Sequence, residues 1–472
     1  MRLLIYKHGK RQVNQNQQSG GIWKMSVWNE YKRKLATAAE AARLVRSGDW
    51  VDYHFGLGNP VELDTALAAR KEELHQVKVR GGMRFTPLAV VESDLEQEHF
   101  IYNSWHFSGY ERKLSDQELC HYIPMIYRNM PLYYRKSLDV DVAFLAVSPM
   151  DENGYFYFSL TNSAAEAIRR TARQVVVEVN EKLPVIRAGR ENAIHINDVT
   201  LVVESASPDL PTITPAPFGE TERRIAEQII GRLRDGVTIQ LGVGALPNAV
   251  GALIAESDLR DLGVHTEMLV DAYKDLDQAG KITNRKKKID TGLSVFSFCL
   301  GSAELYDWAR ENAGRLASMP IDYVNDPAVI SANDNVAAIN NCLEVDLRGQ
   351  VTSESAGHRQ ISGTGGQLDF LTGGYLAPEG HGFICLTSTY KDKESGRVRS
   401  RIRPDLPSGA VITNPRSQAH CLVTEWGLAD LAGRSLWERA ERIINIAHPD
   451  FRDDLVQAAQ RLGLWRRSNR VA

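Results

Sequence analysis

The stretch Gly242-Val243-Gly244-Ala245-Leu246-Pro247 decides the fold, because it joins a strand-forming run at 237–241 to a helical pattern. Backbone N–H groups that open a helix after a strand point beyond the sheet edge and favour anions, and glycine lets a ligand come close. A dinucleotide-binding fingerprint would place a third glycine where Pro247 stands, so a nicotinamide site is disfavoured. On this motif alone, a tight scaffold turn and an anion-binding loop remain equal alternatives.

The same order of elements occurs earlier in the chain. Residues 48–60 and 235–247 both contain a Gly or Asp-Gly turn, a strand, Gly-x-Gly and a proline that starts a helix, so Gly56 matches Gly242. Between these copies, residues 205–220 hold four prolines, as expected of a linker. We therefore predict an N-terminal domain at 26–204 and a C-terminal domain at 221–472.

Strands alternate with helices in both halves, and 472 residues are too many for one compact core. The predicted fold class is α/β, with two related open α/β domains whose mostly parallel sheets are flanked by helices. Residues 1–25 are rich in Gln, Asn, Lys and Arg and contain no acidic residue. We expect a disordered extension there; a transit peptide and a true start at Met25 remain open alternatives.

The composition limits the classes of function. A net charge of −3 does not suggest binding to nucleic acid or to anionic membranes, and no apolar run approaches the roughly 20 residues that cross a bilayer. The five cysteines are scattered, so they suggest neither a disulfide framework nor a zinc site, and the histidines lack metal-ligand spacing. We expect no metal, no nucleic-acid or membrane partner, and a cytoplasmic location.

Glu267 lies one βαβ unit after the glycine loop. A right-handed crossover makes the two strands parallel, so the loop and Glu267 should meet at the same carboxyl edge of the sheet. A carboxylate beside an anion-binding loop suggests a nucleophile; the alternative is a cap for the next helix. Further along, the alternating arginines at 397, 399, 401 and 403 face either solvent or phosphates near Lys391.

Several ordered motifs resemble the acetyl-CoA hydrolase/transferase family of class I CoA-transferases. They are Leu241-Gly-Val-Gly-Ala-Leu-Pro-Asn-Ala-Val, Gly263-Val-His-Thr-Glu-Met-Leu-Val-Asp, the segments 339–351 and 354–370, and Val423-Thr-Glu-Trp-Gly. The resemblance covers about residues 26–470. It is strongest to the butyryl-CoA:acetate and 4-hydroxybutyrate CoA-transferase branch.

The resemblance implies a set of site residues. Glu267 would form the glutamyl-CoA thioester, Asn325 would orient its carboxylate, and Glu425 would orient the Asn325 amide. Residues implied in CoA binding are Gly242, Val243, Gly244, Ala245, Leu246, Cys342, Gly365, Gly366 and Lys391. Gly365 and Gly366 would also supply backbone N–H groups to the oxyanions.

The expected activity is transfer of CoA between a short-chain, butyryl-like acyl-CoA and a carboxylic acid such as acetate. Coenzyme A and acyl-CoA would be substrates, with no tightly bound cofactor, and the family implies a homo-oligomer of two or four copies. Two alternatives stay open. One is an acyl-CoA hydrolase, in which water intercepts the intermediate, and the other is a non-catalytic acyl-CoA-binding module.

Overall fold

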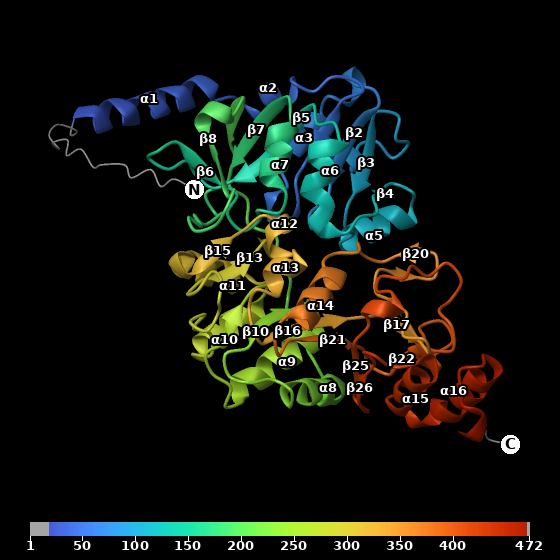
Figure 1. Cartoon of the computed structure of the whole chain (residues 1–472). Helices are drawn as coiled ribbons and strands as arrows, with labels where there is room; N and C mark the ends of the chain where they lie inside the picture. The colour runs from blue at the N-terminus through green and yellow to red at the C-terminus, as the bar shows by residue number, and fades with distance from the viewer. Residues whose placement is uncertain (1–17, 470–472) are drawn as a thin grey trace, which may run out of the picture.

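The computed structural model describes residues 18–469, and its N-terminal half is built on a parallel sheet (Figure 1). The strand order is β4-β3-β2-β1-β5-β7-β9. The strands are β4 (His121–Tyr122), β3 (Phe100–Ser104), β2 (Val77–Gly81), β1 (Trp50–Asp52), β5 (Val142–Val147), β7 (Gln174–Val179) and β9 (Leu201–Glu204). β5 is buried along its whole length, as expected for a parallel strand covered on both faces.

The C-terminal half repeats this plan with the order β11-β10-β16-β21-β25-β26. The strands are β11 (Gly263–Val264), β10 (Thr238–Leu241), β16 (Val336–Asn341), β21 (His381–Cys385), β25 (Cys421–Thr424) and β26 (Gly427–Asp430). All neighbours are parallel except β25 and β26, which form an antiparallel edge. The predicted α/β fold class is therefore confirmed.

Helices flank both sheets (Figure 1). In the N-terminal half they are α1 (Gln18–Lys34), α2 (Ala38–Ala42), α3 (Glu62–Ala68), α4 (Ala89–Glu92), α5 (Gly109–Asp116), α6 (Met130–Lys136) and α7 (Ala165–Thr171). In the C-terminal half they are α8 (Glu220–Ile230), α9 (Ala245–Glu256), α10 (Asp271–Gln278), α11 (Ala303–Glu311), α12 (Ile321–Val324), α13 (Pro327–Ile330), α14 (Gln367–Leu376), α15 (Leu436–Asn445) and α16 (Pro449–Arg461).

Shorter strands complete the C-terminal half. β12 (Met268–Leu269) pairs with β14 (Phe298–Cys299), and β13 (Ser294–Phe296) pairs with β15 (Leu316–Ser318). Beyond the carboxyl end of β16, β17 (Glu344–Asp346) lies between β18 (Val351–Thr352) and β24 (Ile402–Arg403). A hairpin joins β22 (Thr389–Lys391) to β23 (Val398–Ser400).

The boundaries differ slightly from those expected. α1 begins at Gln18, inside the range predicted to be disordered, and residues 1–17 lie outside the described residues. No helix or strand lies between β9 and α8, a stretch that the structure describes in full, in keeping with the proline-rich linker at 205–220. The division into two domains stays a prediction. Within residues 18–469, no helix is long and apolar enough to cross a membrane.

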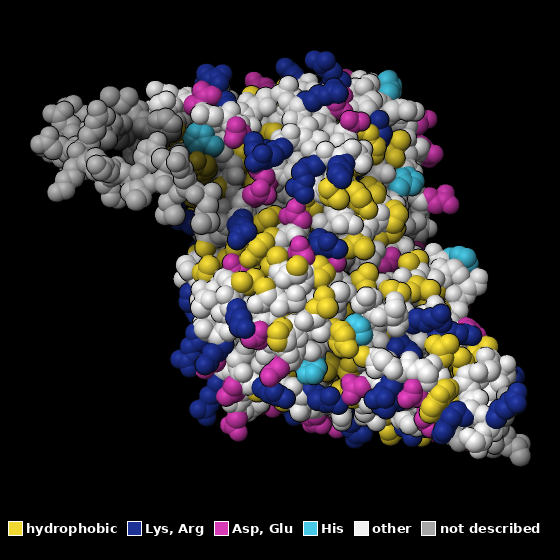
Figure 2. Space-filling view, viewed as in Figure 1, with side chains coloured by type: hydrophobic (Ala, Val, Ile, Leu, Met, Phe, Trp, Pro, Cys, Tyr) yellow, Lys and Arg dark blue, Asp and Glu magenta, His cyan; other side chains and the backbone are white. Residues whose placement is uncertain are grey.

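The two halves share one large hydrophobic core. Phe55, after β1, packs against Tyr127 and against Phe298 of the C-terminal half, with ring centroids 5.0 Å and 5.3 Å apart. Figure 2 shows hydrophobic side chains gathered across the middle of this face, between the upper and lower parts of the molecule. Because both sheets direct loops into this seam, residues from both halves reach one place.

Candidate functional site

Glu267 lies at this seam, between β11 and β12, and its side chain is half-buried. Its Oε2 accepts a 2.5 Å hydrogen bond from Asn325 Nδ2, and the backbone N–H of Gly366 also donates to the carboxylate. Asn325, which ends α12, is fully buried, so its amide is held in place. The structure therefore brings Asn325 and Gly366 to the Glu267 carboxylate, and the catalytic roles expected of them stay predictions.

The backbone of Gly366 lies so close to Asn325 and Glu267 that there is no room for a side chain at this position. A Cβ atom there would lie 2.0 Å from Asn325 Nδ2 and 2.2 Å from Glu267 Oε2. Gly365 has φ +60°, a left-handed conformation that glycine adopts without strain, and its own Cβ would stand 3.8 Å from Glu267 Oε1. The two glycines thus let the main chain approach the carboxylate, to which the Gly366 N–H donates.

Burial raises the pKa of Glu267 to about 7, and the nearby carboxylate of Asp369 adds to this rise, while the Asn325 and Gly366 donors oppose it. Asp369 accepts from Arg128 Nε at 3.1 Å, and burial raises the pKa of Asp369 to about 6. Its Oδ2 is buried and has no hydrogen-bond partner within the described residues. Near neutral pH, Glu267 is therefore balanced between a proton-carrying acid and a nucleophilic carboxylate.

The N-terminal half fixes the glycine segment from the other side. The backbone N–H of Tyr127 donates to Gly365 O at 3.2 Å, and Thr364 N–H donates to the Tyr122 hydroxyl at 3.2 Å. Both tyrosines belong to the stretch 92–137, which is rich in aromatic residues. Tyr122 and Tyr127 do pack between the halves, and they do so beside the candidate site.

The loop at 242–246 lies at the same sheet edge as Glu267, since β10 and β11 are parallel. The Leu241 N–H donates to the Tyr273 hydroxyl at 2.7 Å, and Tyr273 also bonds the Thr266 side chain, next to Glu267. Gly244 has φ +118°, and α9 begins at Ala245. A cavity of about 250 Å³ opens between Val243, Gly244 and the linker residues 213–216.

Three predicted site residues lie elsewhere. The Glu425 carboxylate accepts hydrogen bonds from the Ser388 N–H, at 2.9 Å, and from the Ser388 hydroxyl. Among residues 18–469 no hydrogen bond joins Glu425 to Asn325, whose Oδ1 is unpartnered, so the expected positioning of Asn325 by Glu425 is not found.

Cys342 and Lys391 differ in exposure. The Cys342 thiol is buried, which raises its pKa to about 12. Cys342 follows Asn341, whose Nδ2 donates to Val243 O at 3.4 Å, so it lies near the loop although its thiol is covered. Lys391 is exposed on β22. Neither side chain has a described contact with Glu267, and their roles in CoA binding stay predictions.

Sequence reasoning missed the pair formed by Arg128 and Asp369. Asp369 stands three positions after Gly366 in the glycine-rich segment, so its place near Glu267 had a signal in the sequence. Arg128 had none, because it reaches Asp369 across 241 positions of the chain.

Comparison with known proteins finds similar chains over nearly the whole length of this one. Residues 17–213 match the acetyl-CoA hydrolase/transferase N-terminal domain, and residues 301–459 match the C-terminal domain of the same family. Butyryl-CoA:acetate CoA-transferase of Anaerostipes caccae is 45% identical, covering 94% of this chain and 100% of that protein. The probable butyrate:acetyl-CoA coenzyme A-transferase of Syntrophomonas wolfei is 48% identical, with coverage of 94% and 98%. The crystal structure of RipA from Yersinia pestis superposes with a TM-score of 0.85 at 35% identity, covering 93% of this chain and 99% of RipA.

Proposed function

Because the chain belongs to the acetyl-CoA hydrolase/transferase family, we propose that it transfers CoA between a short-chain acyl-CoA and a carboxylate such as acetate, with Glu267 as the covalent nucleophile. The observation that carries the proposal is the Glu267 carboxylate, held between the Asn325 amide and the Gly366 N–H at the edge that bears the 242–246 loop. The names of the relatives support a butyryl-like acyl group.

The first half-reaction loads CoA onto the enzyme. The ionised Glu267 carboxylate attacks the thioester carbonyl and expels CoA thiolate, which leaves an acyl–glutamyl anhydride. The thiolate then attacks the glutamyl carbonyl, and the acid departs as a carboxylate. The product is a thioester between Glu267 and CoA, and no proton is gained or lost.

The second half-reaction reverses these steps with a new acid. Its carboxylate attacks the glutamyl-CoA thioester, thiolate leaves, and the thiolate attacks the new acyl carbonyl, which frees Glu267. Each tetrahedral intermediate on the glutamyl carbon bears an oxyanion. The Asn325 Nδ2 and Gly366 N–H donors already address that carboxyl group and would stabilise this charge.

The intermediate can be trapped directly. Incubation with butyryl-CoA and then tritiated borohydride should reduce the thioester and label a peptide that contains Glu267, and acetate added before the borohydride should remove the label. Turnover without any label, or a label that persists in Glu267→Ala, would show that Glu267 is not the covalent nucleophile.

The acceptor separates the alternatives. Acetyl-CoA formed in proportion to acetate supports transfer, whereas CoA release that ignores acetate supports hydrolysis. Acyl-CoA binding without turnover for any acceptor would support a binding module. Assembly into two or four copies and a cytoplasmic location also stay predictions, and sedimentation velocity tests the first.

A further inference from the structure

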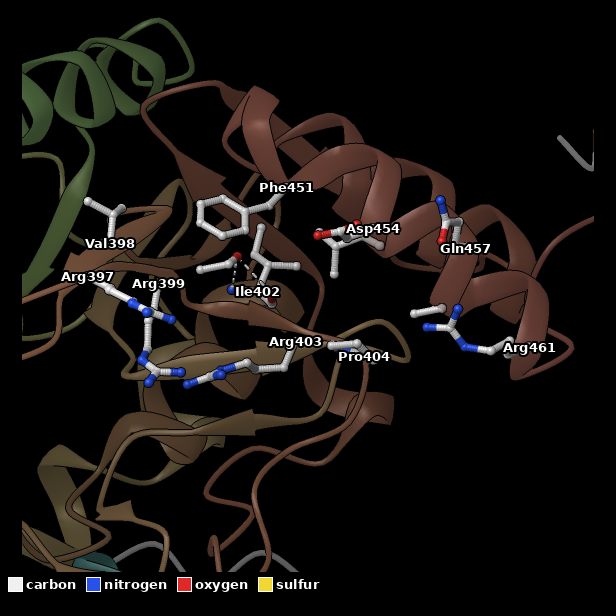
Figure 3. A pocket seen from close by; sticks show the side chains of 13 residues that line it. Arg397, Val398, Arg399, Ile402, Arg403, Pro404, Phe451, Asp454, Gln457 and Arg461 are labelled. Carbon is white, nitrogen blue, oxygen red and sulfur yellow. Dashed lines mark hydrogen bonds between the residues drawn. The ribbon is translucent and has the colours of Figure 1, made fainter. Parts of the chain in front are cut away.

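A pocket of about 480 Å³ lies between the β23–β24 segment and α16, in the C-terminal layer of the molecule (Figure 3). One wall carries Arg397, Arg399 and Arg403, and α16 contributes Arg461. In Figure 3 the first three arginines gather at one end of the pocket and Arg461 stands at the other. Neither Glu267 nor the 242–246 loop lines it.

The positive charge in this pocket is only partly neutralised. Arg403 donates to Glu344 at 2.5 Å and 2.8 Å, and Arg399 lies 3.6 Å from Asp392. Within residues 18–469, Arg397 and Arg461 have no ion-pair partner. Like charges around one cavity repel, so this arrangement is more favourable when an anion occupies it.

The pocket also offers apolar surface. Ile402, Leu455 and Ala458 are buried beneath it, and the half-buried ring of Phe451 stands at one side. On α16, positions 451, 454, 455, 458 and 461 share one face by helical spacing. Asp454 is the one acidic side chain among the lining residues, and a carboxylate there suits an amino group or a sugar hydroxyl.

We propose that this pocket binds a nucleotide, with its phosphates at the arginines of the β23–β24 wall and its base against the apolar floor. The volume is in the range of small-molecule sites. Arginine suits phosphate because its fork of donors makes two parallel hydrogen bonds. Figure 2 shows Lys and Arg side chains around the C-terminal helices, which favours the approach of an anion.

Two sources can supply this ligand: a free nucleotide, and the nucleotide end of CoA. The second source rests on the proposed function, and a chain of contacts leads towards it. Val243 O accepts from Asn341, Arg401 Nη1 donates to Leu343 O at 3.0 Å, and the next arginine, Arg403, bonds Glu344 in the pocket wall. The pocket thus continues the sheet edge that begins at the 242–246 loop.

Calorimetric titration of the full chain with ADP and with adenosine 3′,5′-bisphosphate tests the site without turnover. The double variant Arg397→Gln/Arg461→Gln should bind either nucleotide at least about tenfold more weakly, since charge-assisted bonds to phosphate are lost. Arg434→Gln removes an exposed arginine of the same layer, paired 3.7 Å from Glu438, and should bind as the parent does.

Kinetics with butyryl-CoA and butyryl-pantetheine then assign the source. If the pocket holds the nucleotide of CoA, the double variant raises KM for butyryl-CoA, leaves kcat unchanged and leaves butyryl-pantetheine unaffected. If it holds a free nucleotide, KM stays unchanged while nucleotide binding is lost. Absence of nucleotide binding to the parent, or equal binding by parent and double variant, overturns the proposal. Neither result depends on the label at Glu267, so failure of the proposed function is seen separately.

Discussion

The two Gly-x-Gly loops occupy the same place in their sheets, but one is closed and the other is open. Gly56, Leu57 and Gly58 are all buried, and the Gly56 N–H donates to Gly82 O at 3.1 Å. In the second loop, Val243 is 54% exposed and the flanking glycines are only half-buried. The shared turn is therefore a property of the scaffold, and access to solvent distinguishes the candidate ligand loop.

The residues that follow the neighbouring strands make the contrast sharper. When Gly56 is matched to Gly242, Asp52 is the counterpart of Thr238. In the strand register, Asp52 lies opposite Arg80 and Thr238 lies opposite Gly263. Arg84 follows Arg80 by the same number of positions as Glu267 follows Gly263. Arg84 and Glu267 therefore occupy equivalent positions in the two halves.

Arg84 and Glu267 use this shared position in opposite ways. Arg84 is fully buried and donates to Pro60 O, Thr86 O, Pro87 O and Asp64. Glu267 stays half-buried, with donors on one side. One copy of the edge contributes to stability, and the other keeps a reactive group accessible.

The largest expected effect is on kcat, at the sheet edge that bears the open 242–246 loop. Glu267→Gln removes the nucleophile and should lower kcat by about a thousandfold or more. It also removes a buried charge, so the thermal midpoint at pH 8 should not fall. Steady-state rates and circular dichroism check both points. A kcat within tenfold of the parent would contradict a reactive role for Glu267.

Arg84→Met tests the contribution to stability of the N-terminal sheet edge, which bears the closed Gly56–Gly58 loop. It leaves Asp64 buried without its ion-pair partner, which should cost about 3–5 kcal/mol of unfolding free energy, while kcat per folded molecule stays close to that of the parent. Urea denaturation measures the loss. Arg135→Met removes an exposed pair with Asp322, 2.9 Å away, and should cost less than about 1 kcal/mol.

Gly366→Ala should disturb the donors around Glu267. The new Cβ would collide with Asn325 Nδ2 and Glu267 Oε2, so we expect kcat to fall by about a hundredfold to a thousandfold. Gly314→Ala is the matched control, because nothing lies within 4 Å of its Cβ. Equal rates in the two variants would refute the donor role.

Alanine in each loop sharpens the contrast directly. At Gly58 a Cβ would lie 2.1 Å from His54 Nδ1, so Gly58→Ala should cost about 1–3 kcal/mol of stability and leave KM unchanged. At Gly244 there is space, but φ is +118°, so the exposed loop should rearrange. Gly244→Ala should raise KM for acyl-CoA about tenfold with little loss of stability. The reverse pattern would show that the open loop is only a turn.

The smallest effect is the pH dependence. With the Glu267 pKa near 7, kcat/KM should fall about tenfold per pH unit below that value and level off above it. Asp369→Asn removes a carboxylate that raises this pKa, so the midpoint should move to lower pH. The raised pKa also means that the fold loses stability as pH rises from its ordinary 4.5 to about 7, a loss that Glu267→Gln should lack. An unchanged midpoint in Asp369→Asn would argue against this coupling.

The parts of the fold that depend on local pattern could be predicted from the sequence. Strand, glycine turn and helix follow one another within a few positions, and the parallel pairing of β10 with β11 then places Glu267 at the loop's edge. Predicting the α/β class and the position of Glu267 at the sheet edge required no long-range information beyond this rule.

Contacts between distant segments could not be predicted in this way. Nothing near Arg128 indicates that it meets Asp369, and family resemblance supplied a role for Glu425 without its partner, Ser388. The openness of one loop and the closure of the other also depend on which distant segments lie against them, as Gly82 O does against the Gly56 N–H. Such packing is a tertiary outcome that no local spacing records.

The segment 361–369 is fastened to the N-terminal half by several bonds, including those from Arg112 to Ile361 O, from Thr364 to Tyr122 and from Arg128 to Asp369. On the ribosome, the N-terminal half is made first and Glu267 emerges before Gly366 does. A nascent chain that stops between them carries the proposed nucleophile without the Gly366 donor. The proposed activity would therefore begin only once segment 361–369 has been made and has packed against the first half.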